Sequence, residues 1–268
     1  MPPYEGETRA GYLEFLVRHF ELPDFIDDDP ISIPHGFDDP RDQEIIGLYA
    51  ALLAWGRRDT LLKNLAWLCE IMHFAPHQFV SRFSQKKAAL LSNFKHRTFQ
   101  PIDAVWFTLC LQAALLQYGS LENYFSSYLG PNDQHVGPAI EGFSASLLDR
   151  VPDCPVRLQK HLARPSNGSA CKRLSMFLRW MVRPGPVDLG IWPSIRPAQL
   201  VLPLDVHSGR TARALGLLDR RANDWQAVLE LTEQCRLLSP DDPARYDFAF
   251  FGTGISGLPI DPRFDVLS

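Results

Sequence analysis

Apolar residues recur at the spacing of an α-helix through much of this chain, and no stretch alternates as a half-buried β-strand would. The spacing predicts helices over residues 45–53, 61–68 and 104–115, because side chains three and four positions apart share one helix face. Pro76 and Pro101 each favour the start of a helix. We therefore expect an all-α fold.

Length and composition narrow the class of protein further. With 268 residues, 46% of them hydrophobic, the chain can bury a core without cross-links. Its longest apolar run, residues 45–55, is too short to cross a bilayer, and the N-terminal residues lack the pattern of a signal peptide. We expect a cytoplasmic protein with no membrane partner. Five widely spaced cysteines predict core thiols rather than a disulfide framework or a metal–thiolate site.

The net charge of -4 conceals two regions of opposite sign. Residues 1–44 carry 12 acidic and three basic residues, and residues 21–44 are expected to form an acidic loop. Residues 156–213 carry ten basic residues against only Asp188 and Asp205. Such a local excess predicts a phosphate-binding face, and a merely solvated basic surface is the alternative.

The segment 156–216 holds the most informative pattern. We predict a helix over residues 156–162, a tight turn over 165–168 and a second helix over 169–183 that carries Lys172 in its first turns. Residues 184–203 contain five prolines and several apolar side chains, which favours an ordered loop packed on the protein.

This segment resembles the helix-hairpin-helix DNA glycosylase superfamily, the group of endonuclease III and the 8-oxoguanine glycosylases. Gly168 and Lys172 stand where that group has a hairpin glycine and a nucleophilic lysine, although only one of the usual glycines is present. The sequence Leu-Asp205-Val-His207-x-x-Arg210 is similar to the segment that places the catalytic aspartate at the head of a helix.

The interval of 33 residues between Lys172 and Asp205 resembles the archaeal 8-oxoguanine glycosylase branch. Residues 172–183, 203–207 and 246–254 are also similar to an uncharacterised bacterial family that we associate with that branch. The resemblance implies one two-lobed helical domain over residues 1–268.

The chemistry of the pair follows from the residue types. A lysine must be neutral to attack a sugar carbon, and a position in the first turn of a helix within a basic stretch disfavours the charged ammonium of Lys172. Asp205 can cap the next helix as a carboxylate and assist the lysine or stabilise positive charge on the sugar. A solvated helix lysine and a plain helix cap are the simpler interpretations of the two residues.

Other side chains are candidates for binding DNA. The expected contacts to phosphates come from Gly168, Arg173, Arg210, Arg213, Arg57 and Arg58, and surface ion pairs are the alternative. The expected walls of a base pocket are Trp55, Phe177, Trp180 and Trp192, and core packing is the alternative.

We expect no metal and no cofactor. His207 lies near Asp205, but no second carboxylate and histidine cluster accompanies it, and a carboxylate with an amine suffices for the proposed chemistry.

Together these features predict a monomeric DNA repair glycosylase with AP lyase activity, acting on double-stranded DNA with a damaged base or an abasic site. The resemblance alone suggests 8-oxoguanine as the base. A non-enzymatic DNA-binding protein on the same scaffold and a helical protein-interaction module are the alternatives.

Overall fold

The computed structural model describes residues 3–267, and within that range the chain is all-helical, with isolated bridges but no strand. The α-helices are α1 (Arg9–Phe20), α2 (Asp24–Asp27), α3 (Ser32–His35), α4 (Pro40–Leu53), α5 (Arg58–Ile71), α6 (Pro76–Ser81), α7 (Gln85–Leu90), α8 (Pro101–Tyr118), α9 (Leu121–Ser126), α10 (Gly137–Ser146), α11 (Lys172–Val182), α12 (Val206–Ala214), α13 (Trp225–Leu238) and α14 (Asp247–Ser256). The 3-10 helices are η1 (Leu148–Arg150), η2 (Val156–His161), η3 (Pro165–Asn167), η4 (Pro197–Gln199) and η5 (Pro243–Tyr246).

The three helices predicted from apolar spacing are confirmed as α4, α5 and α8. Asp39 caps α4 by accepting a hydrogen bond from the Arg41 amide, and Pro40 occupies the first turn, where its missing N–H costs nothing. A capping box of Gln100 and Asp103 starts α8 beside Pro101. Local sequence signals therefore set these helix starts.

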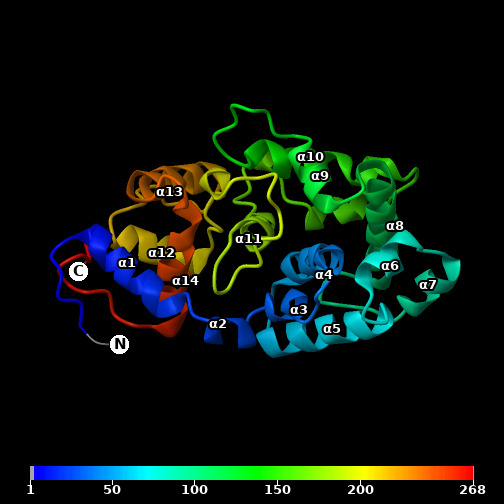
Figure 1. Cartoon of the computed structure of the whole chain (residues 1–268), viewed down its shortest axis with the longest axis horizontal. Coiled ribbons are helices and arrows are strands. Elements are labelled where there is room, and N and C mark those ends of the chain that lie inside the picture. Colours follow the sequence, from blue (N-terminus) through cyan, green and yellow to red (C-terminus); the bar gives the residue numbers. More distant parts are fainter. Residues whose placement is uncertain (1–2, 268) are drawn as a thin grey trace.

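The helices form two groups along the longest axis of the molecule (Figure 1). One group contains α1, α12, α13 and α14 together with both chain ends, and the other contains α3 to α10. Helix α11 lies between them and packs on α4, where Gly47 permits a close approach of the side chains of Phe177 and Met181. Residues from both groups of helices can therefore surround the start of α11.

Three predicted segments differ in detail. Residues 21–44 are not one loop: they contain α2, α3 and the start of α4, because Ile31 and Pro34 are buried and order the chain there. The helix predicted over residues 156–162 is the 3-10 helix η2, which ends at His161, rather than an α-helix; such a short segment gains little from helix propagation. The next helix begins at Lys172, not at residue 169, because Cys171 adopts a left-handed backbone with φ of 50°.

Residues 184–203 are ordered and packed, as predicted. The amide of Leu189 donates to the carbonyl of Trp180, and the amide of Trp192 donates to the carbonyl of Met181. The buried Trp192 indole donates from Nε1 to a carboxylate oxygen of Glu44 on α4. The loop is thereby fixed to the C-terminal half of α11 and to α4.

Candidate functional site

Lys172 lies in the first turn of α11, as the sequence suggested, and is the first residue of that helix rather than its fourth. Its side chain is 32% exposed. No side chain caps this helix start, and no acidic residue lies in its first turn. The free amide groups of that turn place a partial positive charge beside the ammonium.

Asp205 is the N-cap of α12, which the sequence also suggested. Its backbone is extended, and its Oδ1 accepts a hydrogen bond from the amide of Ser208 at 2.9 Å. The side chain of Asn223 donates to the Asp205 carbonyl at 2.9 Å, which fixes the residue from the other side. Asp205 is thus held in one orientation at the head of the helix.

The structure brings these two residues together. Lys172 Nζ lies 2.6 Å from Asp205 Oδ2, and the Asp205 side chain is 16% exposed. Burial acts to raise the pKa of Asp205, but the Lys172 ammonium and the Ser208 amide outweigh it, so the pKa is lowered from its ordinary value. The carboxyl group therefore stands ionised against the lysine, at the point where two helix starts converge.

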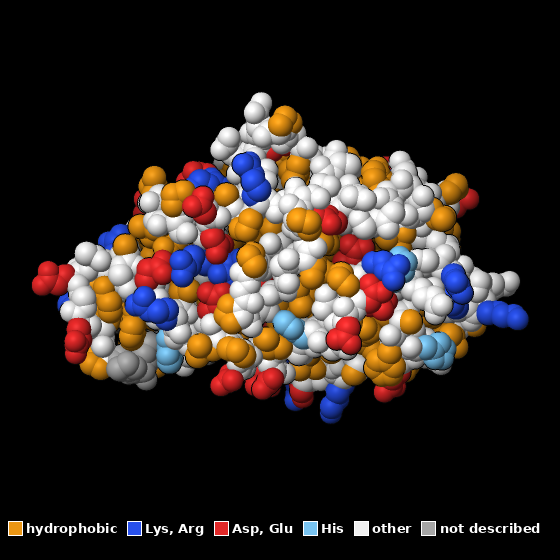
Figure 2. Space-filling model, in the orientation of Figure 1, with side chains coloured by type: hydrophobic (Ala, Val, Ile, Leu, Met, Phe, Trp, Pro, Cys, Tyr) orange, Lys and Arg blue, Asp and Glu red, His pale blue; other side chains and the backbone are white. Residues whose placement is uncertain are grey.

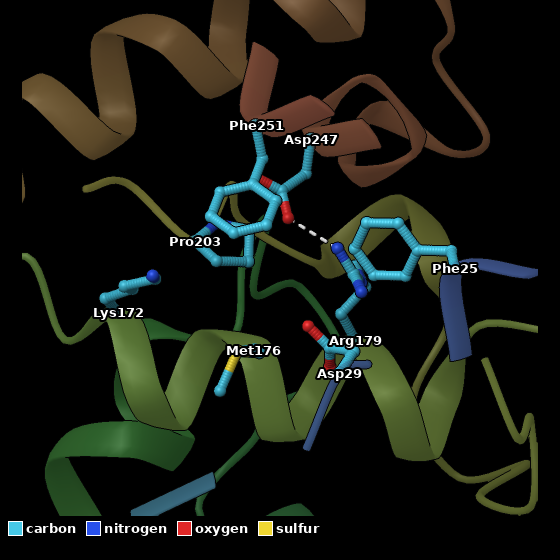
Figure 3. Close-up of a pocket in the computed structure, with 8 residues that line it drawn as sticks. All are labelled: Phe25, Asp29, Lys172, Met176, Arg179, Pro203, Asp247 and Phe251. Carbon is cyan, nitrogen blue, oxygen red and sulfur yellow. Dashed lines mark hydrogen bonds and ion pairs between the residues drawn. The ribbon is translucent and has the colours of Figure 1, made fainter. Parts of the chain in front are cut away.

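A small cavity opens beside Lys172 (Figure 3). Helix α11 contributes Lys172, Met176 and Arg179, which share one face because they are spaced four and three residues apart. The other lining residues come from distant segments: Phe25, Asp29, Pro203, Asp247 and Phe251. The Phe251 ring lies above the lysine in Figure 3, with its centroid 5.2 Å from Nζ.

Asp29 was not singled out by the sequence analysis. Its carboxylate is buried and receives a single hydrogen bond within the described part of the chain, from the amide of Ile31 at 3.1 Å. Burial raises the pKa of Asp29, and the nearby charges of Arg179, Arg58 and Lys172 only partly oppose that rise. It also lines a second hollow, beside Trp55 and Arg58. Asp29 therefore stands between two cavities with spare capacity to accept hydrogen bonds.

Asp247 was also missed. It begins α14, pairs with the Arg179 guanidinium and receives a 3.4 Å contact from the Ser208 hydroxyl. Burial raises its pKa to about 6, against the opposing effect of Arg179. The only signal in the sequence was the segment 246–254, whose resemblance to the bacterial family did not identify a role for this aspartate.

The expected base pocket is corrected by the structure. Phe177, Trp180 and Trp192 are at most 2% exposed and belong to the core, where Phe177 packs edge-on against Trp192. Phe177 follows Lys172 by five residues and so faces about 140° around the helix from it. Of the four predicted aromatic residues only Trp55 lines a hollow that contains Lys172. Phe25 and Phe251 are the aromatic residues of the cavity itself.

The residues expected to contact DNA are not equivalent. Gly168 is exposed in a left-handed turn, as a hairpin requires, and Arg58 is exposed at the rim of the second hollow. Arg57 is exposed and pairs with Asp59. Arg210 is also exposed and has one 3.4 Å contact to the carbonyl of Gly254.

Two of the expected DNA contacts are already used inside the protein. Arg173 donates to the carbonyl of Leu52 at 2.6 Å, and its guanidinium lies over the ring of Trp55. Arg213 donates to the carbonyl of Arg220 and to Asn223. These bonds hold both guanidinium groups against neighbouring segments, and the phosphate contacts expected from these two residues stay predictions.

The excess of basic residues in 156–213 does not form one surface. Arg179 and Arg183 are buried in ion pairs with acids, several of them far outside the segment, and Arg157 pairs with Asp103. On the face drawn in Figure 2, basic and acidic side chains are interspersed rather than gathered into one basic area. The predicted phosphate-binding face is therefore reduced to the exposed basic residues near the pair.

The described residues contain neither a cluster of metal-binding side chains nor a membrane-spanning helix. Among residues 3–267 no group of three or more His, Cys, Asp or Glu side chains is placed to hold a metal ion. No helix in the same range has the length and apolar character needed to span a membrane.

Comparison with known proteins places the chain in a family. No curated protein and no solved structure matches it. A family model described as "Protein of unknown function (DUF2400)" matches residues 29–256, which include Asp29, Lys172, Asp205 and Asp247. The match covers most of the chain, so the chain belongs to this family of proteins of unknown function.

Proposed function

We propose that the protein is a DNA glycosylase with AP lyase activity, built on a two-lobed helix-hairpin-helix glycosylase fold. Its nucleophile is Lys172, and Asp205 is the acid–base partner. The observation that carries the proposal is the 2.6 Å contact between Lys172 Nζ and Asp205 Oδ2 beside an aromatic cavity. The chain brings these two groups together from 33 residues apart, at the positions that a glycosylase resemblance assigns to nucleophile and carboxylate.

The proposed reaction uses the pair in sequence. Asp205 accepts a proton from the Lys172 ammonium, and the freed lone pair attacks C1′ of the damaged nucleotide while the bond to the base breaks. The departing base takes the proton that Asp205 accepted. The nitrogen lone pair then opens the sugar ring: the C1′–O4′ bond breaks, O4′ takes a proton that the new C1′ amine loses, and a protonated imine remains. The imine acidifies the C2′ proton, and loss of that proton expels the 3′ phosphate as the C3′–O bond breaks. If the base leaves before the lysine attacks, Asp205 is still ionised and stabilises the positive charge that develops on the sugar.

The cavity supports a flipped-base mechanism. A base removed from the duplex needs apolar or aromatic walls, and Met176 and Phe251 lie on two sides of the space next to Lys172. In this arrangement the sugar of the flipped nucleotide would lie over the Lys172–Asp205 pair.

A covalent trap tests the proposal. Wild-type protein is incubated with borohydride and a panel of duplexes that contain single damaged bases or an abasic site, and adducts are resolved on a denaturing gel. We expect an adduct with the abasic duplex and with at least one damaged base, and none with Lys172→Gln, which keeps length and polarity but lacks the amine.

Lys160→Gln is the matched control, because Lys160 is an exposed lysine of the same segment, 12 positions before Lys172, and donates only to the carbonyl of Thr98. It should trap as well as wild type. If wild type binds damaged duplexes but forms no adduct, the non-enzymatic DNA-binding alternative is the better account. If it neither binds nor traps, the protein-interaction alternative replaces both.

A further inference from the structure

Two cysteines on segments distant in the sequence face each other on the side of the molecule built from α8. Cys110 Sγ, in the middle of α8, lies 3.7 Å from Cys154 Sγ, and both are thiols in this structure. The other cysteines, Cys69, Cys171 and Cys235, are also buried, but no contact between sulfur atoms involves them within the described residues. The five widely spaced cysteines of the sequence do not predict a disulfide.

The two thiols differ in access. Cys110 is fully buried, whereas Cys154 is partly exposed and lines a surface hollow between η1 and η2, together with Pro152 and Asp153. A small oxidant in solvent therefore reaches Cys154 first and Cys110 only through it. This is the arrangement of an attacked thiol and a resolving thiol.

The backbone around Cys154 holds it in place. Asp153 has a left-handed backbone with φ of 60°, and Pro155 follows with its φ fixed by the ring. Two turns before Cys110 on the same helix face, Asp103 pairs with Arg157 and contacts His161 of η2. The segment that carries Cys154 is thus already bound to α8 next to the sulfur contact, so joining the sulfurs needs only a small further approach.

We propose that Cys110 and Cys154 are an oxidation site that forms a reversible intramolecular disulfide and fastens the start of the 156–161 segment to α8. The consequence is structural. Residues 156–171 run from this point to Lys172, and a covalent bond at residue 154 restricts the unfolding of that segment. The proposal is independent of the proposed DNA chemistry.

The reaction balances with a peroxide as the oxidant. The Cys154 thiolate attacks one peroxide oxygen, the O–O bond breaks, hydroxide leaves and a sulfenic acid remains. The Cys110 sulfur then attacks the Cys154 sulfur, the S–O bond breaks, and the hydroxide takes the Cys110 proton to leave as water. The two sulfurs lose two electrons, the peroxide is reduced to two molecules of water, and a dithiol reverses the bond.

Burial raises the pKa of both thiols, so the reactive thiolate is scarce at neutral pH. The rate of disulfide formation should therefore increase about tenfold from pH 7 to pH 8, because the thiolate fraction increases tenfold per unit below the pKa.

Mass spectrometry of the full-length protein tests the proposal. The protein is treated with hydrogen peroxide, its remaining thiols are blocked with N-ethylmaleimide under denaturing conditions, and it is digested. We expect a peptide pair joined through Cys110 and Cys154 that disappears on treatment with dithiothreitol. The oxidised protein should take up two fewer labels and melt several degrees higher than the reduced protein, since the bond closes a loop of 44 residues.

Variants sharpen the result. Cys154→Ser should abolish the cross-link, and Cys110→Ser should leave Cys154 to proceed to sulfinic acid. Cys235→Ser should cross-link as wild type does, because that thiol is buried away from the pair. If peroxide yields only over-oxidised Cys154 in the wild-type protein, or joins other cysteines to an equal extent, the proposal is wrong. The digest of the wild-type protein alone distinguishes these outcomes, so the test of the disulfide holds even if a serine variant does not fold.

Discussion

Basic side chains lie at both ends of one face of α11, but they differ in exposure and in the number of their carboxylate partners. At the start of α11, Lys172 makes one ion pair with Asp205 and is 32% exposed. Two and three turns later, Arg179 and Arg183 are 4% and 5% exposed and are enclosed by carboxylates. Asp188 lies between these two arginines and bonds to both.

The comparison shows what separates an accessible charge from a structural one. The buried arginines need several partners each, because a buried charge is tolerated only when it is fully hydrogen-bonded. Arg183, for example, bonds to Glu21, Asp188 and Asp242, which ties α11 to three other segments. Lys172 has solvent access and one ion-pair partner, so a ligand can approach its amine.

The largest expected effect is on stability, from a substitution of the buried Arg179 in α11. Arg179→Ala leaves Asp247 without its guanidinium and Asp188 with only Arg183, and should lower the free energy of unfolding by about 3–5 kcal/mol. Chemical denaturation measures it. The control is Arg221→Ala, at an exposed position, which should change stability by less than about 0.5 kcal/mol. Equal effects of both variants would contradict the structural role of Arg179.

Because we propose that Lys172 and Asp205 are the reacting pair, a substitution there should change activity rather than stability. Asp205→Asn keeps the capping oxygen for the Ser208 amide but removes the charge that faces Lys172. Base excision should fall by about two orders of magnitude or more, while the denaturation midpoint changes little. Single-turnover excision assays with the substrate found in the trapping panel measure the rate. A variant that unfolds in parallel with its loss of activity would place Asp205 among the structural ion pairs instead.

Asp29 is intermediate between the Lys172–Asp205 pair and the buried ion pairs. It is buried like the acids that pair with Arg179 and Arg183, but it accepts only one hydrogen bond. If Asp29 accepts a hydrogen bond from the flipped base, Asp29→Asn should reduce excision of a damaged base by about ten- to a hundredfold, because a hydrogen bond to a charged group is worth about 1.5–3 kcal/mol. Trapping on an abasic duplex should be unchanged, because no base occupies the cavity. Equal losses on both substrates would instead assign Asp29 to the support of Lys172.

The same variant has a pH signature. The pKa of Asp29 is raised in the folded protein, so the folded state binds its proton more tightly than the unfolded state does. Its contribution to stability is therefore lost as the pH rises above the ordinary carboxyl range, and Asp29→Asn should remove that part of the pH dependence.

Local signals predicted three of the long helices and the positions of Lys172 and Asp205 at helix starts. Apolar spacing predicted α4, α5 and α8, and the prolines marked helix starts. Asp205 was expected as a cap, and Lys172 was expected in a first turn, because both properties depend on neighbours within a few residues. The meeting of the two required the glycosylase resemblance.

Long-range pairing was not predictable from composition. Arg157 and Arg183 counted toward a basic segment, but their carboxylate partners include Asp103 and Glu21, far away in the sequence. The cavity aromatic residues Phe25 and Phe251 lie near opposite ends of the chain, and nothing local marks them as neighbours. A charge count or an aromatic spacing cannot distinguish a surface from a core without the tertiary contacts.

The smallest expected effect concerns two arginines of α12 that the sequence treated alike. Arg210 is exposed and keeps most of its donors free, whereas Arg213 donates to the carbonyls of Arg220 and Ala222 and to Asn223. If DNA passes over the start of α12, Arg210→Ala should flatten the salt dependence of duplex binding by about one unit in log–log slope, because one phosphate contact releases about one counterion. Arg213→Ala should leave the slope unchanged and lower the free energy of unfolding by about 1 kcal/mol, since it removes hydrogen bonds that hold residues 220–223. Fluorescence anisotropy over a range of salt concentrations measures both slopes. An unchanged slope for Arg210→Ala, or a flattened one for Arg213→Ala, would show that the division of these arginines into free and structural groups is wrong.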